Sequence, residues 1–144
     1  KAKVSPGAGT DLSRSHYIHF MSRRNDGKYD VDGATKIDAA TAKQMFDEDS
    51  VKFVDVRAKV DYGWGAVPGA INLSLVTELS KPGLMAVANP DDAIAFYCHG
   101  EHCPYSAYAS AKALAWGFTN VHYFASGFPA WKEAGYPIKT AETE

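Results

Sequence analysis

The sequence predicts an α/β fold in which a mainly parallel central sheet carries helices on both faces. From Lys36 onward, short apolar runs alternate with helical segments, an order typical of parallel strands joined by crossover helices. The first run, residues 51–56, is rich in valine and nearly continuous, as expected for a strand buried on both faces. A chain of 144 residues, 46% hydrophobic and 22% charged, is large enough for one such domain.

Four strands are expected in this part of the chain, at residues 51–56, 70–73, 93–97 and 121–124. Four helices are expected between and around them, at residues 38–46, 74–80, 106–116 and 129–135. Asp38, Ser74 and Ser106 are residue types that cap helix N-termini well. Pro129 suits the first turn of the last helix, and Gly135 suits its end.

The first 34 residues differ from this pattern. They carry turn signals at residues 5–9, 25–27 and 32–33 and predict an N-terminal extension or a linker from an upstream domain. The α/β domain itself is expected at residues 35–140, followed by a tail at 141–144.

Charge and composition exclude several function classes. The formal net charge of −2 leaves no basic surplus for binding a nucleic-acid backbone. The apolar run at 93–97 is too short to span a bilayer, so no membrane span is expected. The two cysteines, Cys98 and Cys103, lie in one loop, which indicates local chemistry rather than a disulfide-stapled secreted fold. The compartment stays open between cytoplasm and periplasm.

Cys98 is the main candidate for chemistry. It follows the predicted strand at 93–97 directly and precedes a predicted helix, and ligands of parallel sheets bind beyond the carboxyl ends of the strands. Backbone N–H groups of such a loop, together with the N-terminus of the following helix, stabilise negative charge. A cysteine placed there is more easily deprotonated and becomes a nucleophile. The simpler alternative is that Cys98 is a small buried hydrophobic residue at a strand end.

Three stretches of the chain resemble the rhodanese family. The first joins Val54-Asp55-Val56-Arg57 to Asp61-Tyr62 and then to Val67-Pro68-Gly69-Ala70-Ile71-Asn72-Leu73. The second is the Cys98 loop with the alanine-rich helix that ends in Trp116-Gly117-Phe118. The third is Gly127-Phe128-Pro129-Ala130-Trp131 followed by Ala134-Gly135-Tyr136-Pro137-Ile138. Their order and spacing are similar to those of the family over residues 36–139.

The resemblance implies a rhodanese-like three-layer α/β/α fold and sulfur transfer. Cys98 would accept a sulfane sulfur from a small donor such as thiosulfate, and a thiol acceptor, small molecule or protein, would remove it. Asp55 and Arg57 would support the loops rather than touch substrate. No cofactor and no resident metal are implied. The residues that would supply the substrate-binding loop are His99, Gly100, Glu101, His102, Cys103 and Ser106.

The loop departs from the family pattern in length, charge and cysteine content. Two additional residues separate Cys98 from Ser106, and the loop has no arginine or lysine. It carries Glu101, which is expected to oppose a dianion such as thiosulfate. Cys103 would resolve a Cys98 persulfide or sulfenate as a disulfide, act as an alternative nucleophile, or be packed and inert.

Three other functions fit parts of the sequence. A phosphatase or arsenate reductase on the same fold would use the longer loop for a tetrahedral anion but lacks a cation there. A metal site would use Cys98, His99, His102 and Cys103, although so short a segment rarely surrounds one ion. A redox-sensing or regulatory module would use the cysteine pair without turnover.

Overall fold

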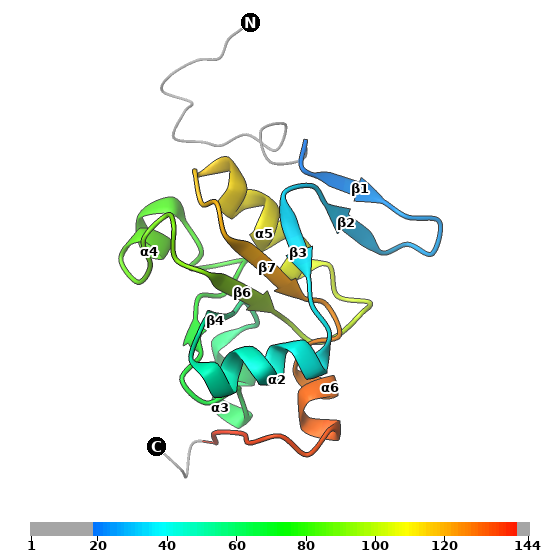
Figure 1. Ribbon diagram of the computed structural model, residues 1–144, viewed down its shortest axis with the longest axis vertical. Coiled ribbons are helices and arrows are strands. Elements are labelled where there is room, and N and C mark those ends of the chain that lie inside the picture. The colour runs from blue at the N-terminus through cyan, green and yellow to red at the C-terminus, as the bar shows by residue number, and fades with distance from the viewer. Residues whose placement is uncertain (1–18, 141–144) are drawn as a thin grey trace, which may run out of the picture.

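The computed structural model describes residues 19–140, and its centre is a five-stranded, entirely parallel sheet in the order β3-β7-β6-β4-β5 (Figure 1). A separate two-stranded antiparallel hairpin precedes it. The strands are β1 (Met21–Arg23), β2 (Tyr29–Val31), β3 (Ala34–Lys36), β4 (Lys52–Asp55), β5 (Ile71–Asn72), β6 (Ile94–Tyr97) and β7 (Val121–Phe124). The helices are α2 (Ala39–Glu48), α3 (Lys59–Trp64), α4 (Lys81–Met85), α5 (Tyr105–Ala115) and α6 (Gly127–Glu133).

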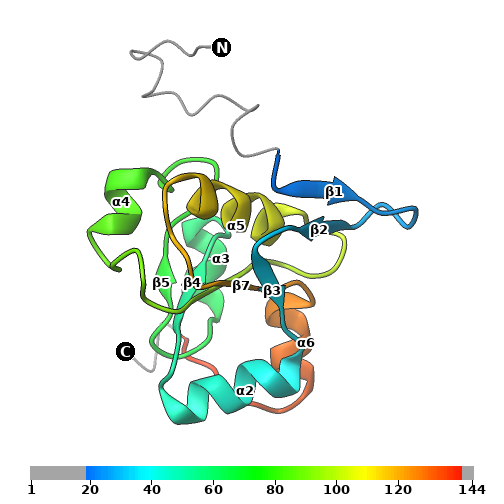
Figure 2. The ribbon, with the colours of Figure 1, turned by 45° about the horizontal axis from the view of Figure 1, so that its top comes forward.

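The predicted fold class is confirmed, because helices cover both faces of this sheet (Figure 2). The period-two alternation of a strand sends successive side chains to opposite faces. On β4, Val54 packs in the core with α4 and α5, whereas Phe53 packs on the other side with α2 and α6. On β6, Phe96 and Tyr97 divide in the same way, which explains why this strand is buried at every position.

The central strand brings the candidate site to one edge of the sheet. In the register of the sheet, Tyr97 of β6 pairs with Asp55 of β4 and with Phe124 of β7. The segments that follow these three residues therefore leave the sheet at the same edge. This edge carries the Cys98 loop.

The prediction that Asp38 caps α2 is confirmed, but the prediction that Ser106 caps α5 is wrong. The Asp38 carboxylate accepts a hydrogen bond from the Thr41 N–H at 2.8 Å. In contrast, α5 begins at Tyr105 with Pro104 at the N-cap position, and Ser106 lies inside the helix, 2% exposed. The fixed φ of Pro104 starts the helix earlier than the Ser106 hydroxyl could cap it.

The helix predicted at 74–80 is also wrong, because residues 75–78 form turns and the others have no regular structure. The helix of this region is α4, which starts at Lys81, directly after the predicted range. The Ser80 hydroxyl caps it by accepting a hydrogen bond from the Gly83 N–H at 3.0 Å. Pro82 lies in the first turn of α4, where a missing N–H costs no hydrogen bond. The last helix likewise starts at Gly127, before Pro129.

Residues 19–34 fold against the domain as the β1–β2 hairpin. Val31 is buried in a cluster with Ala107 and Ala111 of α5 and with Tyr123 of β7. The rings of Tyr29 and Tyr108 are 5.8 Å apart. The domain boundary expected at residue 35 stays a prediction, but the hairpin forms one wall of the region described next. No helix of the described residues is long and apolar enough to cross a membrane.

Candidate functional site

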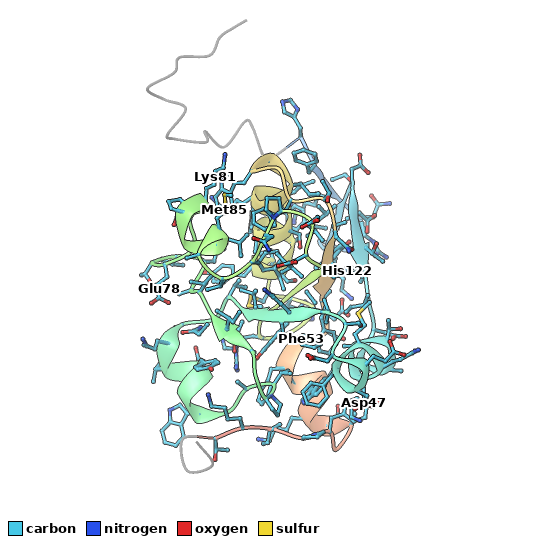
Figure 3. All side chains as sticks on the ribbon, turned by 60° about the vertical axis from the view of Figure 1, so that its left-hand side comes forward. Asp47, Phe53, Glu78, Lys81, Met85 and His122 are labelled. Carbon is cyan, nitrogen blue, oxygen red and sulfur yellow. A yellow bond between two sulfur atoms is a disulfide. The ribbon has the colours of Figure 1, made fainter. Side chains whose placement is uncertain are left out.

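The two cysteines lie at the carboxyl end of the central strand and are joined to each other. Cys98 directly follows β6, is 1% exposed, and forms a disulfide with Cys103, the Cα atoms being 6.6 Å apart. Figure 3 draws a disulfide as a yellow bond among the side chains. Cys103 is only partly buried. The structure therefore represents an oxidised state, in which neither sulfur is a thiolate, and Cys103 is the more exposed of the pair.

The backbone of the Cys98 loop is held by the start of α6. The Cys98 carbonyl accepts a hydrogen bond from the Phe128 N–H at 3.0 Å. Gly127 has φ +67°, and a Cβ atom there would lie 2.6 Å from the Cys98 carbonyl oxygen and 2.9 Å from the Gly100 nitrogen. Only glycine permits so close an approach of the two backbones in this conformation. The position of Cys98 thus depends on a contact 29 residues further along the chain.

Within the loop, several N–H groups have no acceptor among residues 19–140. The Cys103 N–H donates to the Gly100 carbonyl at 2.9 Å, which makes the loop a tight turn. The N–H groups of the four residues between the cysteines donate to no acceptor in the described part of the chain; these are His99, Gly100, Glu101 and His102. Unpaired backbone donors next to a helix N-terminus are suited to an anionic ligand.

The charge of Glu101 is balanced by two lysines that the sequence did not connect to the site. Lys28 Nζ of the hairpin lies 3.4 Å from the Glu101 carboxylate, and Lys36 Nζ of β3 lies 4.0 Å from it. Two positive charges therefore accompany the one negative charge of Glu101, and the expected repulsion of a dianion by the loop stays a prediction. The pairs are partly exposed, so each contributes little to stability.

Two cavities meet at Cys103. The hairpin-side cavity has a volume of about 220 Å³ and lies between the β1–β2 hairpin and the loop. The α3-side cavity has a volume of about 630 Å³ and lies between the loop, α3 and the turns at 74–77. Cys103 lines both cavities, whereas Cys98 lines neither. Ser106 lines the hairpin-side cavity together with Lys28, Lys36, Glu101 and His102.

Asp55 and Arg57 form a buried ion pair beside the loop. The Arg57 guanidinium donates to the Asp55 carboxylate at 2.6 Å and to the Gly65 carbonyl at 2.6 Å. It also lies over the Phe128 ring, with 4.6 Å between the guanidinium carbon and the ring centre. This set of contacts joins the end of β4 to the chain on both sides of the Cys98 loop.

Burial and the Asp55–Arg57 charges together shift the pKa values of Arg57 and Tyr97. Burial lowers the pKa of the Arg57 guanidinium, but the hydrogen bond and charge of Asp55 outweigh it, so the net shift is upward. Burial also raises the pKa of the Tyr97 phenol, and the Asp55 charge raises it further. Tyr97 therefore stays protonated, and its hydroxyl oxygen accepts from the Val67 N–H at 3.1 Å.

The histidines of the loop do not gather around a common point. His99 Nε2 lies 3.4 Å from the Asp61 carboxylate on the α3 side, whereas His102 lines the hairpin-side cavity. Within residues 19–140, no group of three or more His, Cys, Asp or Glu side chains could hold a metal ion. The four side chains considered for a metal site from the sequence are thus divided between a disulfide and two separate surroundings.

Together these features define a class of protein: a parallel α/β domain with a cysteine loop at the mouth of its central strand. The family model described as the rhodanese-like domain matches residues 38–134. The chain belongs to the rhodanese-like domain family.

Several solved structures are similar to this chain. The BH2092 protein of Bacillus halodurans aligns with a TM-score of 0.68 at 20% identity, over 77% of this chain and 82% of that one. The human single-domain sulfurtransferase TSTD1 aligns with a TM-score of 0.59 at 18% identity, over 69% and 96%. A Rhodopseudomonas palustris protein of unknown function, described as a possible tyrosine phosphatase, aligns with a TM-score of 0.56 at 26% identity, over 74% and 85%. At identities this low, these structural similarities show a shared fold and nothing more specific.

Proposed function

We propose that the reduced domain is a sulfur carrier that forms a persulfide on Cys98 and passes the sulfane sulfur to a thiol acceptor. The observation that carries this proposal is the position of Cys98, directly after the central strand and beside four backbone N–H groups without an acceptor among residues 19–140. Such donors stabilise a thiolate and, equally, a terminal persulfide anion.

The chemistry takes two displacement steps. The Cys98 thiolate attacks the sulfane sulfur of the donor, the sulfur–sulfur bond of the donor breaks, and the donor leaves with the electron pair. The donor leaves as a thiolate when it is a persulfide, and as sulfite when it is thiosulfate. The acceptor thiolate then attacks the terminal sulfur of the Cys98 persulfide, and Cys98 leaves as a thiolate.

The oxidised pair must open before the first step. In the disulfide Cys98 is 1% exposed and is not a thiolate, so it cannot act as the nucleophile toward a donor sulfur. Reduction separates the two sulfurs, and Cys103, which lines both cavities, is then free to move away from Cys98. Because the charges of Lys28 and Lys36 offset that of Glu101, we propose thiosulfate as a sulfur donor in addition to a small persulfide.

Transfer is therefore expected to depend on the redox state of the pair. Reduced wild-type protein should move sulfur from a persulfide donor or from thiosulfate to cyanide, measured as thiocyanate, whereas oxidised protein should be at least tenfold slower. Cys103→Ser cannot form the disulfide and should be active without prior reduction. The proposal fails if the reduced protein transfers sulfur from neither donor, or if oxidised and reduced proteins react equally fast.

A phosphatase function is less well supported. Phosphoryl transfer needs a cation at the equatorial oxygens. Arg57, which lines the α3-side cavity, is committed to Asp55 and Gly65, and Lys28 and Lys36 lie beside the Glu101 carboxylate. Hydrolysis of para-nitrophenyl phosphate by the reduced protein that is lost in Cys98→Ser would favour that function instead.

A further inference from the structure

The disulfide presents its two sulfurs unequally to solvent. Cys98 is 1% exposed and lines neither of the two cavities described above, whereas Cys103 is partly exposed and lines both. A thiol that opens a disulfide must reach one sulfur along the direction of the bond that breaks. Access therefore favours attack at Cys103, with Cys98 as the leaving thiolate beside the loop N–H groups.

The two routes to Cys103 differ in charge. Lys28, Lys36 and Glu101 line the hairpin-side cavity, so one positive charge is left over. On the α3 side, the charge of Arg57 is paired with Asp55 outside the cavity. Of the other lining residues, Lys59 adds one positive charge and Asp61 one negative charge, so no charge is left over. The hairpin side is therefore the route that attracts an anion.

The hairpin side is also the smaller of the two routes. Its volume of about 220 Å³ admits a molecule of roughly amino-acid size, rather than a protein thiol on a folded domain. One wall is made by Gly27, Lys28 and Tyr29, which lie outside the residues matched by the family model. This wall of the cavity therefore lies outside the segment that the family model matches.

We propose that the hairpin-side cavity is a binding site for a small thiol that carries a carboxylate, and that this thiol reduces the disulfide by attacking Cys103. The carboxylate lies near Lys28 and Lys36, and the thiolate reaches the Cys103 sulfur. The Cys98–Cys103 bond breaks, a mixed disulfide forms on Cys103, and Cys98 leaves with the electron pair. A second molecule of the thiol attacks the mixed disulfide, which releases the thiol's own disulfide and leaves two cysteine thiols. This inference concerns the oxidised protein. It holds whether or not the reduced protein forms a persulfide on Cys98.

The test is the rate of disulfide reduction by three thiols of different charge. They are 3-mercaptopropionate, neutral 2-mercaptoethanol and cationic cysteamine, each compared between wild type and variant so that intrinsic thiol reactivity cancels. Lys28→Gln and Lys36→Gln should each slow 3-mercaptopropionate about threefold, leave 2-mercaptoethanol unchanged and speed cysteamine. Lys59→Gln, the matched lysine of the α3-side cavity, should change none of the three rates.

Mass spectrometry shows separately which of the two cysteine sulfurs the thiol attacks. Acid quenching and alkylation during the reaction should give a peptide with the mercaptopropionate adduct on Cys103 and the alkyl group on Cys98. The proposal is overturned if the adduct is on Cys98, or if only Lys59→Gln slows the acidic thiol. An equal change for all three thiols in Lys28→Gln also overturns it, because that result reports displacement of the hairpin rather than recognition of charge.

Discussion

Arg57→Met is expected to lower the free energy of unfolding by about 3–5 kcal/mol, because it leaves the Asp55 carboxylate buried without its cation. Asp55 is 0% exposed, and the Arg57 backbone and guanidinium N–H groups satisfy both of its carboxylate oxygens. The same variant removes the donor to the Gly65 carbonyl. Urea unfolding followed by far-ultraviolet circular dichroism measures the change.

Two further variants separate the lone charge from the loss of packing. The double variant Asp55→Asn with Arg57→Met leaves no unpaired ion and should recover part of the lost stability. Lys43→Met breaks the exposed Lys43–Asp47 pair on α2 and should cost less than about 1 kcal/mol. A cost for Arg57→Met as small as that for Lys43→Met would contradict the structural role assigned to the buried pair.

Gly127→Ala is expected to reduce sulfur loading of Cys98 at least tenfold and to lower the free energy of unfolding by about 3 kcal/mol. The left-handed conformation costs a residue with a Cβ about 1–2 kcal/mol, and the contact with the Cys98 carbonyl at 2.6 Å adds an overpacking cost. Since the new Cβ also lies 2.9 Å from the Gly100 nitrogen, the loop backbone must shift. Displacements of this kind strongly slow a reaction that needs an aligned attack.

Gly135→Ala is the matched control for this prediction. Gly135 has φ +81°, but a Cβ there would meet no atom within 4 Å. The variant should therefore show the cost of the left-handed conformation alone and load sulfur at the wild-type rate. Equal loading rates for Gly127→Ala and Gly135→Ala would mean that the contact between Gly127 and the loop does not position Cys98.

Local patterns predicted four of the five strands of the sheet and the place of Cys98, but not β3, which starts in the segment expected to be a linker. The apolar run at 93–97 ends at the same residue as β6, and residues 121–124 coincide with β7. The Asp38 cap was predictable because its hydrogen bond to Thr41 spans three residues. In contrast, α3 has six residues, none of them buried, so it lacks the periodic apolar face by which a helix is predicted.

The surroundings of the loop could not be predicted in this way, because they depend on contacts between distant parts of the chain. Lys28 and Glu101 are 73 residues apart in the sequence, and the turn-rich composition around Lys28 indicated a linker. The close approach of Gly127 to Cys98 leaves no trace in the local pattern, although the Gly127-Phe128-Pro129 motif marked the position as part of the family resemblance. A disulfide between Cys98 and Cys103 was one of three roles that the sequence allowed for Cys103.

The most direct measurement is the location of sulfur on the reduced protein after incubation with a persulfide donor. In the Cys103→Ser variant, mass spectrometry with peptide fragmentation should find one additional sulfur atom on Cys98. The Cys98→Ser variant should gain none. A sulfur atom found on Cys103 in wild-type protein, and formed there at an undiminished rate in Cys98→Ser, would contradict the assignment of Cys98 as the carrier.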